Sequence, residues 1–159
     1  MNFANLKMTA LINAYSLFKI PALAFITPQI IEMDDTKSVI QVRLGMRTRN
    51  HLGVMYFGAL AMGSELSIAL RALNAIHDSG KKIDFIFKDF QCDFLKRADG
   101  HVHFVCTDGA KIAALVAKAA ASSERMTETF SGLAFVPSAS QEPVMTYKLT
   151  LSVKQRARK

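Results

Sequence analysis

Residues 54–63 form an unbroken run of apolar residues and glycines near the middle of the chain. A helical pattern extends from about Met55 to about Ile76, and the sequence Asp78-Ser79-Gly80 ends it. A helix without a polar stripe over its first half must be surrounded by protein. The uncharged run, residues 52–64, is too short to cross a bilayer. We therefore predict a buried central helix around which the other elements are arranged.

Glu65 is an anomaly, because it places a carboxylate in this predicted buried helix. Burying an unpaired charge costs roughly several kcal/mol, so such groups are usually paired, protonated or functional. In one interpretation, Glu65 pairs with Arg71 or an arginine of the preceding loop, or lies at the edge of the buried face. In the other, Glu65 is a catalytic carboxylate in a cleft.

The size and composition of the chain predict one domain, residues 1–153, followed by a basic tail, residues 154–159. Half of the 159 residues are apolar, which indicates an interface hidden in an oligomer. The formal net charge is +7, and much of the excess lies in the tail. We expect the tail to be solvated. Nucleic-acid binding is disfavoured, because basic and aromatic residues are not interleaved on one face.

The cysteines and the N-terminal residues indicate a cellular compartment. Cys92 and Cys106 fall inside apolar strand patterns, which predicts buried thiols in a reducing compartment rather than a disulfide. Asn5, Lys7 and Asn13 interrupt the apolar N-terminus, so the pattern of a secretory signal is not met. We expect a cytoplasmic protein without a membrane span.

The remaining elements follow from hydrophobic periodicity and turn residues. An amphipathic helix over residues 3–18 has Phe3, Leu6, Leu11, Tyr15 and Phe18 near helical spacing. The predicted strands are residues 29–33, 38–46, 82–95, 101–107, 126–136 and 145–153, and a short helix over residues 109–121 is expected to be capped by Asp108.

Two local features refine this strand pattern. The alternation of the long strand changes phase at Lys88-Asp89, which predicts a β-bulge. Asp99-Gly100 is a hairpin signal, so residues 101–107 are expected to return along the same strand. The whole order predicts an α+β protein in which an antiparallel curved sheet wraps around one long central helix, with an N-terminal helix and a short helical insertion. This architecture is the hot-dog fold.

With this architecture, the segment from Asn50 resembles the motif of hot-dog-fold acyl-CoA thioesterases of the phenylacetate-pathway type. That motif is Asn-x-x-Gly-x-x-His-Gly-Gly, with an acidic residue seven positions after the last glycine. Asn50, Gly53 and Gly58 match the Asn, the first Gly and the last Gly, and Glu65 matches the acidic position, where Asp is usual.

This chain departs from the motif at two neighbouring positions. Tyr56 stands where the family has His, and Phe57 replaces the first glycine of the pair. A phenol donates a hydrogen bond but cannot act as an acid near neutral pH as His can. The patterns Thr-Arg-Asn-His-Leu and Tyr-Phe-Gly-Ala-Leu are also similar to an uncharacterised group of predicted thioesterases.

The resemblance implies hydrolysis of an acyl-CoA or acyl-carrier-protein thioester in a homo-oligomer, with CoA as part of the substrate and no other cofactor. In the family the acidic residue acts from the partner subunit. Glu65 would activate water or attack directly, and Asn50 would orient the water or the carbonyl. The helix N-terminus at Phe57 and Gly58 would polarise that carbonyl, with Tyr56 as a hydrogen-bond donor.

Substrate-binding residues also follow from the resemblance. Gly53 and Phe57 would contact the substrate, and Phe57 would restrict the acyl group. Arg47 and Arg49, with Lys96 and Arg97 as further candidates, would bind the CoA phosphates, although an ordinary solvated charge at a strand end is the commoner explanation for any one of them.

Several alternatives remain open. A non-hydrolytic acyl-CoA-binding protein is the main one, because Tyr56 and Phe57 alter the motif. A dehydratase or hydratase is disfavoured, because its chemistry prefers a His at that position. His51 could assist catalysis or be merely exposed. His101 and His103 share a strand face but lack a third ligand, so we predict no metal site.

Overall fold

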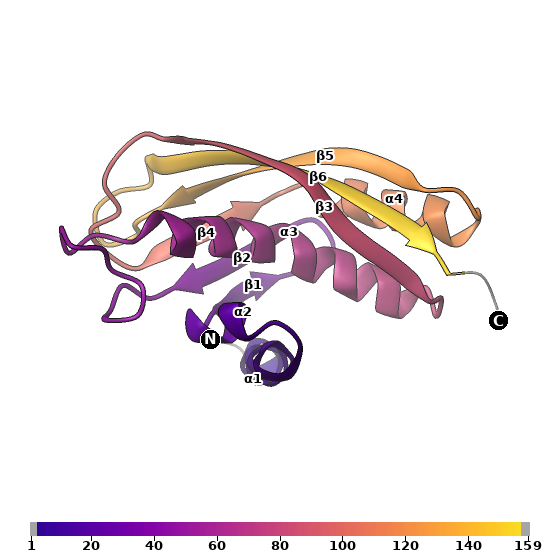
Figure 1. Cartoon of the computed structure of the whole chain (residues 1–159), viewed down its shortest axis with the longest axis horizontal. Coiled ribbons are helices and arrows are strands. Elements are labelled where there is room, and N and C mark those ends of the chain that lie inside the picture. The colour runs from indigo at the N-terminus through magenta and orange to yellow at the C-terminus, as the bar shows by residue number, and fades with distance from the viewer. Residues whose placement is uncertain (1–2, 157–159) are drawn as a thin grey trace.

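The computed structural model describes residues 3–156 of the chain. Four helices and six strands make up this part (Figure 1). In chain order they are α1 (Phe3–Lys19), α2 (Pro21–Phe25), β1 (Gln29–Met33), β2 (Ser38–Val42), α3 (Phe57–Asp78), β3 (Ile83–Phe94), β4 (Val102–Cys106), α4 (Gly109–Ala120), β5 (Met126–Phe135) and β6 (Pro143–Gln155).

The six strands form one antiparallel sheet in the order β1-β2-β4-β5-β6-β3. The sheet curves around α3 (Figure 1), which packs against β2, β4, β5 and α4. Leu66 and Ile68 of α3 are almost completely buried. The predicted α+β hot-dog fold is therefore confirmed, including the N-terminal helix and the helical insertion α4.

Burial of α3 is extensive but not complete. By length and composition alone α3 could cross a membrane, yet 67% of its 18-residue apolar window is buried inside the fold, as in a core helix. The prediction that its first half is covered on all sides was wrong, because Ala61 and Met62 are half-buried and the first turn is exposed. Tyr56 and Phe57 are 46% and 61% exposed, because the first turn of the helix lies beside exposed loop residues 51–53 rather than under the sheet.

The long strand β3 confirms one local prediction and corrects another. Its register against β6 shifts between Phe87 and Phe90, as the phase change predicted. The expected hairpin with β4 does not form, because β3 pairs with β6 while β4 pairs with β2 and β5. A turn signal such as Asp99-Gly100 specifies a reversal of the chain but not the strand that receives it. β3 consequently lies at one edge of the sheet.

Other differences from the predicted elements are small. β2 ends at Val42 rather than residue 46, because Thr48 Oγ1 donates to the Arg43 carbonyl and accepts from Gly45 N in a following turn. The helix α2 was missed, although Pro21 at its first turn is typical of a helix start. Asp108 precedes α4 without a side-chain cap, since its carboxylate accepts from Lys111 Nζ and Ser131 N instead.

The C-terminal residues and the cysteines complete this comparison. β6 continues to Gln155, two residues beyond the predicted strand end, and the Arg156 guanidinium binds the Asp84 carboxylate. Residues 157–159 of the predicted tail lie outside the described residues. Cys106 is buried and Cys92 half-buried, and both are free thiols. Burial raises the pKa of Cys106 to about 11.

The orientation of α1 is the largest departure from the predicted pattern. Most of its apolar residues face outward, and Phe3 and Phe18 are each 81% exposed, whereas Ile12 is buried in the core. The side of α1 that binds β1, at the outer edge of the sheet, carries polar residues. Asn5 Nδ2 donates to the Ile31 carbonyl at 2.7 Å, Thr9 Oγ1 accepts from Ile30 N at 2.9 Å, and Asn13 Nδ2 donates to the Pro28 carbonyl at 2.9 Å. α1 therefore covers one edge of the sheet by hydrogen bonding (Figure 1).

The contact between Gly63 of α3 and Phe104 of β4 generates a stability prediction. A Cβ at Gly63 would overlap the ring of Phe104, which is fully buried and cannot move aside. Alanine in a helix interior normally stabilises by roughly 0.5–1 kcal/mol relative to glycine, whereas overpacking costs about 1–3 kcal/mol. We expect Gly63→Ala to lower the free energy of unfolding by about 1 kcal/mol or more in urea denaturation. Gly45→Ala is the control, because no heavy atom lies within 4 Å of its Cβ position. A stabilised Gly63→Ala protein would contradict the close contact.

Candidate functional site

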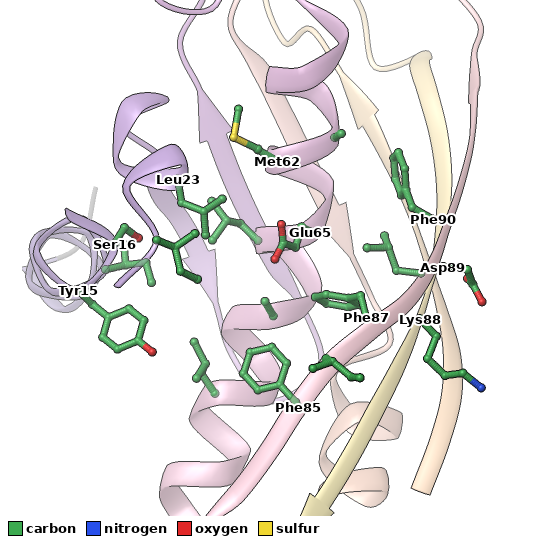
Figure 2. Close-up of a pocket in the computed structure, with 18 residues that line it drawn as sticks. Tyr15, Ser16, Leu23, Met62, Glu65, Phe85, Phe87, Lys88, Asp89 and Phe90 are labelled. Atoms are coloured by element: carbon green, nitrogen blue, oxygen red, sulfur yellow. The ribbon is translucent and has the colours of Figure 1, made fainter. Parts of the chain in front are cut away.

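A cavity of about 710 Å³ lies between α3, β3 and the α1–α2 segment (Figure 2). Its volume is within the range of small-molecule sites. The walls are mainly apolar, with Phe85 and Phe87 from β3, Leu23 from α2 and Met62 from α3 among the lining residues. Such a lining suits an acyl chain better than a polar metabolite.

Glu65 places a carboxylate in this apolar cavity (Figure 2). Met62, Glu65, Ala69 and Leu73 follow one another at helical spacing, so one face of α3 lines the cavity. Ile68 and Ala72, on another face, are fully buried and do not line it. The helix period therefore directs the Glu65 side chain away from the sheet-facing side of α3.

The Glu65 carboxylate has no hydrogen bond or ion pair among residues 3–156. The Arg71 guanidinium instead donates to the Asp35 carboxylate at 3.0 Å, so the pairing of Glu65 with Arg71 does not form. Burial without a compensating charge raises the pKa of Glu65 above its ordinary value. A half-buried carboxylate of this kind in a cavity is the environment expected of a general base.

The loop before α3 is held by its own hydrogen bonds. Asn50 N donates to the Val54 carbonyl at 2.8 Å, and Asn50 Oδ1 accepts from Leu52 N at 2.9 Å. Gly53 has φ of 78°, a conformation that glycine adopts without strain. Gly53 therefore shapes the turn, and the side-chain oxygen of Asn50 already accepts a hydrogen bond within the loop.

The N-terminus of α3 at Phe57 has no side-chain cap, and the first backbone N–H groups of a helix have no partner within it. The Tyr56 ring covers this site: a Cβ at Gly58 would lie 2.5 Å from that ring. Tyr56 also packs edge-on against Phe57, with ring centroids 4.8 Å apart. A carbonyl approaching Gly58 must therefore displace the Tyr56 ring, whose 46% exposure leaves room for rotation.

Within one chain the candidate residues fall into two groups. Glu65 lies eight residues beyond Phe57, which is about 12 Å along a helix at 1.5 Å per residue. The lining of the Glu65 cavity includes none of Asn50, Tyr56, Phe57 and Gly58. A single subunit therefore does not bring the carboxylate to the helix N-terminus.

The candidate basic residues collect near the N-terminus of α3. Met55 N donates to the Ala98 carbonyl at 2.8 Å, so the loop holding Lys96 and Arg97 lies against the loop holding Arg47 and Arg49 (left in Figure 1). These side chains are exposed. The Arg47 guanidinium lies 5.7 Å from the Phe25 ring centroid, and Lys96 pairs with Glu142.

The histidines do not add to either group. His51 is exposed in the loop before α3. His103 Nε2 lies 2.8 Å from Gln41 Nε2, and His101 Nδ1 accepts from Leu44 N. Over the part of the chain that the structure describes, no three side chains of the metal-ligating types cluster.

Ser16 of α1 also lines the cavity, and the sequence did not single it out. A signal was present, because Asn5, Thr9, Asn13 and Ser16 recur at helical spacing in an otherwise apolar helix. The prediction of an amphipathic helix used its apolar residues and did not include this polar stripe.

Comparison with known proteins identifies the family. Residues 8–151 match the model of a domain of unknown function, DUF4442, and the chain belongs to that family. A search of curated proteins found no match.

Solved structures share the fold at low sequence identity. A protein of unknown function from Chlorobaculum tepidum has a TM-score of 0.80 and 8% identity over 96% of this chain and 97% of that one. A Shewanella oneidensis protein named "putative thioesterase" has a TM-score of 0.78 and 9% identity, over 93% and 98% of the two chains. A Haemophilus influenzae thioesterase has a TM-score of 0.65 and 14% identity, over 91% and 88%. Several neighbours of this hot-dog fold are thus named thioesterases.

The raised pKa of Glu65 predicts how stability depends on pH. Because the folded protein holds the Glu65 proton more tightly than the unfolded chain, stability falls as pH rises from the ordinary pKa of Glu through the raised value. Gln stays neutral, so we expect Glu65→Gln to have a higher Tm than the wild type at pH 7.5, with the difference shrinking toward pH 4. Melting curves at pH 4, 5.5 and 7.5 measure this. Glu124→Gln, on an exposed turn, controls for the loss of one negative charge. A Glu65→Gln protein less stable at pH 7.5 would show that the carboxylate has a stabilising partner.

Proposed function

We propose that the protein is a thioesterase that hydrolyses an acyl-CoA or acyl-carrier-protein thioester. The observation that carries this proposal is the unpaired Glu65 carboxylate in an apolar cavity on the central helix of a hot-dog fold. Its position agrees with the acidic position of the thioesterase motif, and thioesterases are among the fold neighbours.

In the proposed reaction Glu65 takes a proton from a water molecule as that water attacks the thioester carbonyl carbon. The carbon–sulfur bond then breaks, the acid is released, and the thiolate leaving group receives the proton. Burial favours this role, because a carboxylate with a raised pKa is a stronger base than an ordinary glutamate. Direct attack by Glu65, with hydrolysis of the resulting anhydride, is the alternative route.

The N-terminus of α3 would stabilise the oxyanion. The backbone N–H groups of Phe57 and Gly58 are available at an uncapped helix end with partial positive charge. The Tyr56 ring would swing away from Gly58 when substrate enters, and its hydroxyl would donate a hydrogen bond. The free Nδ2 of Asn50 would orient the water or the carbonyl, while Gly53 and Phe57 would contact the substrate.

A second copy of the chain would complete the site. α1 covers the β1 edge of the sheet, whereas β3 is a twelve-residue edge strand with exposed Ile86, Phe90 and Phe94. Such an edge is a template for pairing with another strand. Since the Glu65 cavity runs along β3, pairing there would place the carboxylate at the subunit boundary. We propose a homodimer, alone or as half of a tetramer, in which Glu65 faces the partner's α3 N-terminus.

The basic residues near the N-terminus of α3 would bind the substrate's phosphates. Arg47, Arg49, Lys96 and Arg97 are exposed on two adjacent loops, and the net charge of +7 favours an anionic ligand. We further propose a cytoplasmic location, in keeping with the free thiols of Cys92 and Cys106.

Non-hydrolytic acyl-CoA binding is the second candidate function. It is favoured by one observation, the Tyr56 ring packed over Gly58 where a thioester carbonyl would be polarised. If the ring stays in place when a ligand is bound, the protein would hold acyl-CoA without turnover.

The test is release of free thiol from short, medium, long and aryl acyl-CoAs by the wild type, Glu65→Gln and the control Glu124→Gln. We expect Glu65→Gln to lower kcat/KM by about 10²- to 10⁴-fold, the usual contribution of a general base, without a lower Tm. Wild-type kcat/KM should fall at acid pH, as protonation through the raised pKa of Glu65 removes the base.

Two results would overturn the assignment. An active Glu65→Gln protein would remove Glu65 from the mechanism. No thiol release from any substrate, with acyl-CoAs still raising the Tm, would favour the binding protein.

A further inference from the structure

Ser16 is a further polar residue in the lining of the cavity, and its hydroxyl has no partner within residues 3–156. Ser16 is fully buried, and its Oγ makes no hydrogen bond within residues 3–156. Serines inside helices commonly donate to the carbonyl four residues earlier, as Ser64 does to Leu60 at 2.9 Å. Ser16 does not. A buried hydroxyl without a partner destabilises the fold, so its presence calls for an explanation.

The neighbouring polar residues of α1 do not supply that explanation. Asn5, Thr9 and Asn13 each bind the backbone of β1 or the segment just before it. Ser16 follows on the same side of α1 but lines the cavity, and its hydroxyl bonds to no backbone group within residues 3–156. Along the polar stripe of α1, Asn5, Thr9 and Asn13 therefore bind the edge of the sheet, and Ser16 lines the cavity.

Ser16 and Glu65 reach the cavity from different elements. In the view of Figure 2, Ser16 on α1 lies on one side of Glu65, and Phe87 of β3 lies on the other. Ser16 is the buried hydroxyl among the lining residues, because Tyr15 is 49% exposed. Because Ser16 Oγ has almost no accessible surface, a ligand with its thioester at Glu65 and its acyl chain along the apolar wall would reach this buried hydroxyl when the neighbouring side chains move aside.

We propose that Ser16 determines substrate specificity by donating a hydrogen bond to an oxygen on the acyl chain. The preferred substrates would be hydroxyacyl or oxoacyl thioesters rather than unsubstituted ones. The proposal rests on the thioesterase function, because it assigns the cavity to the acyl group. Its physical basis is that an alkyl chain leaves the hydroxyl unpaired, whereas a chain oxygen satisfies it.

The experiment compares kcat/KM for pairs of acyl-CoAs of equal length, with and without a hydroxyl or oxo group, the oxygen being moved along the chain. We expect the wild type to prefer the oxygenated member at one position, and Ser16→Ala to reduce that preference about tenfold. Ser16→Ala should not lower the Tm, since it removes an unpaired buried hydroxyl.

Thr9→Val is the matched control on the same helix. It removes the acceptor for Ile30 N and should lower the Tm while leaving the preference unchanged, which separates docking of α1 from specificity. An equal preference in wild type and Ser16→Ala would overturn the proposal. So would a Ser16→Ala defect of the same size on every substrate, because the hydroxyl would then act at the thioester carbonyl.

A binding measurement separates this proposal from the hydrolytic function. The increase in Tm caused by each acyl-CoA is measured with the Glu65→Gln protein and with Glu65→Gln combined with Ser16→Ala. In one outcome the wild type hydrolyses no ester, yet oxygenated esters raise the Tm more than unsubstituted ones and this difference depends on Ser16. The proposed hydrolysis then fails and the specificity role of Ser16 stands. If hydrolysis occurs without any such difference, only the specificity role fails. If no acyl-CoA is hydrolysed or bound, both are overturned.

Discussion

The packing of α3 against the concave face of the sheet determines where every candidate functional group lies. Gly63 allows the helix to approach Phe104 of β4 more closely than any side chain at that position would permit. Two residues later the helix has turned by about 200°, so Glu65 lies on the opposite side, in the cavity. The contact that anchors the helix in the core therefore also keeps the carboxylate away from the core.

α1 covers the β1 edge of the sheet, whereas the β3 edge is uncovered. The cavity lies at the β3 edge. Polar side chains of α1 satisfy the backbone of β1, which turns most of the apolar residues of that helix outward. β3 keeps an unpaired edge and forms one wall of the cavity. The same arrangement explains why α1 contributes Ser16 to the cavity: a helix laid along β1 extends past the end of the strand and meets α2 and α3.

The unpaired Glu65 and Ser16 side chains both lower the stability of the folded protein, and both lie at the same cavity. Each loses hydration on folding without gaining a protein partner, which disfavours the folded state. Arg71 Nη2 donates to the Asp35 carboxylate, whereas Arg71 Nε is a further buried group without a partner among the described residues. A ligand with oxygen atoms at two separate positions would provide a hydrogen-bonding partner for each of the Glu65 and Ser16 groups.

The sequence alone determined features that depend on neighbouring residues: the buried central helix, the bulge near Lys88-Asp89, the alternation in β6 and the candidacy of Glu65. Each follows from side-chain periodicity or backbone preference within a short segment. Only the tertiary structure decided that β4 lies between β2 and β5, that α1 binds through its polar face, and that Arg71 pairs with Asp35 and not with Glu65. These outcomes depend on competition among groups far apart in the chain, such as Asn5 with Ile31 or β3 with β6. Local periodicity carries no information about which distant partner forms the better contact.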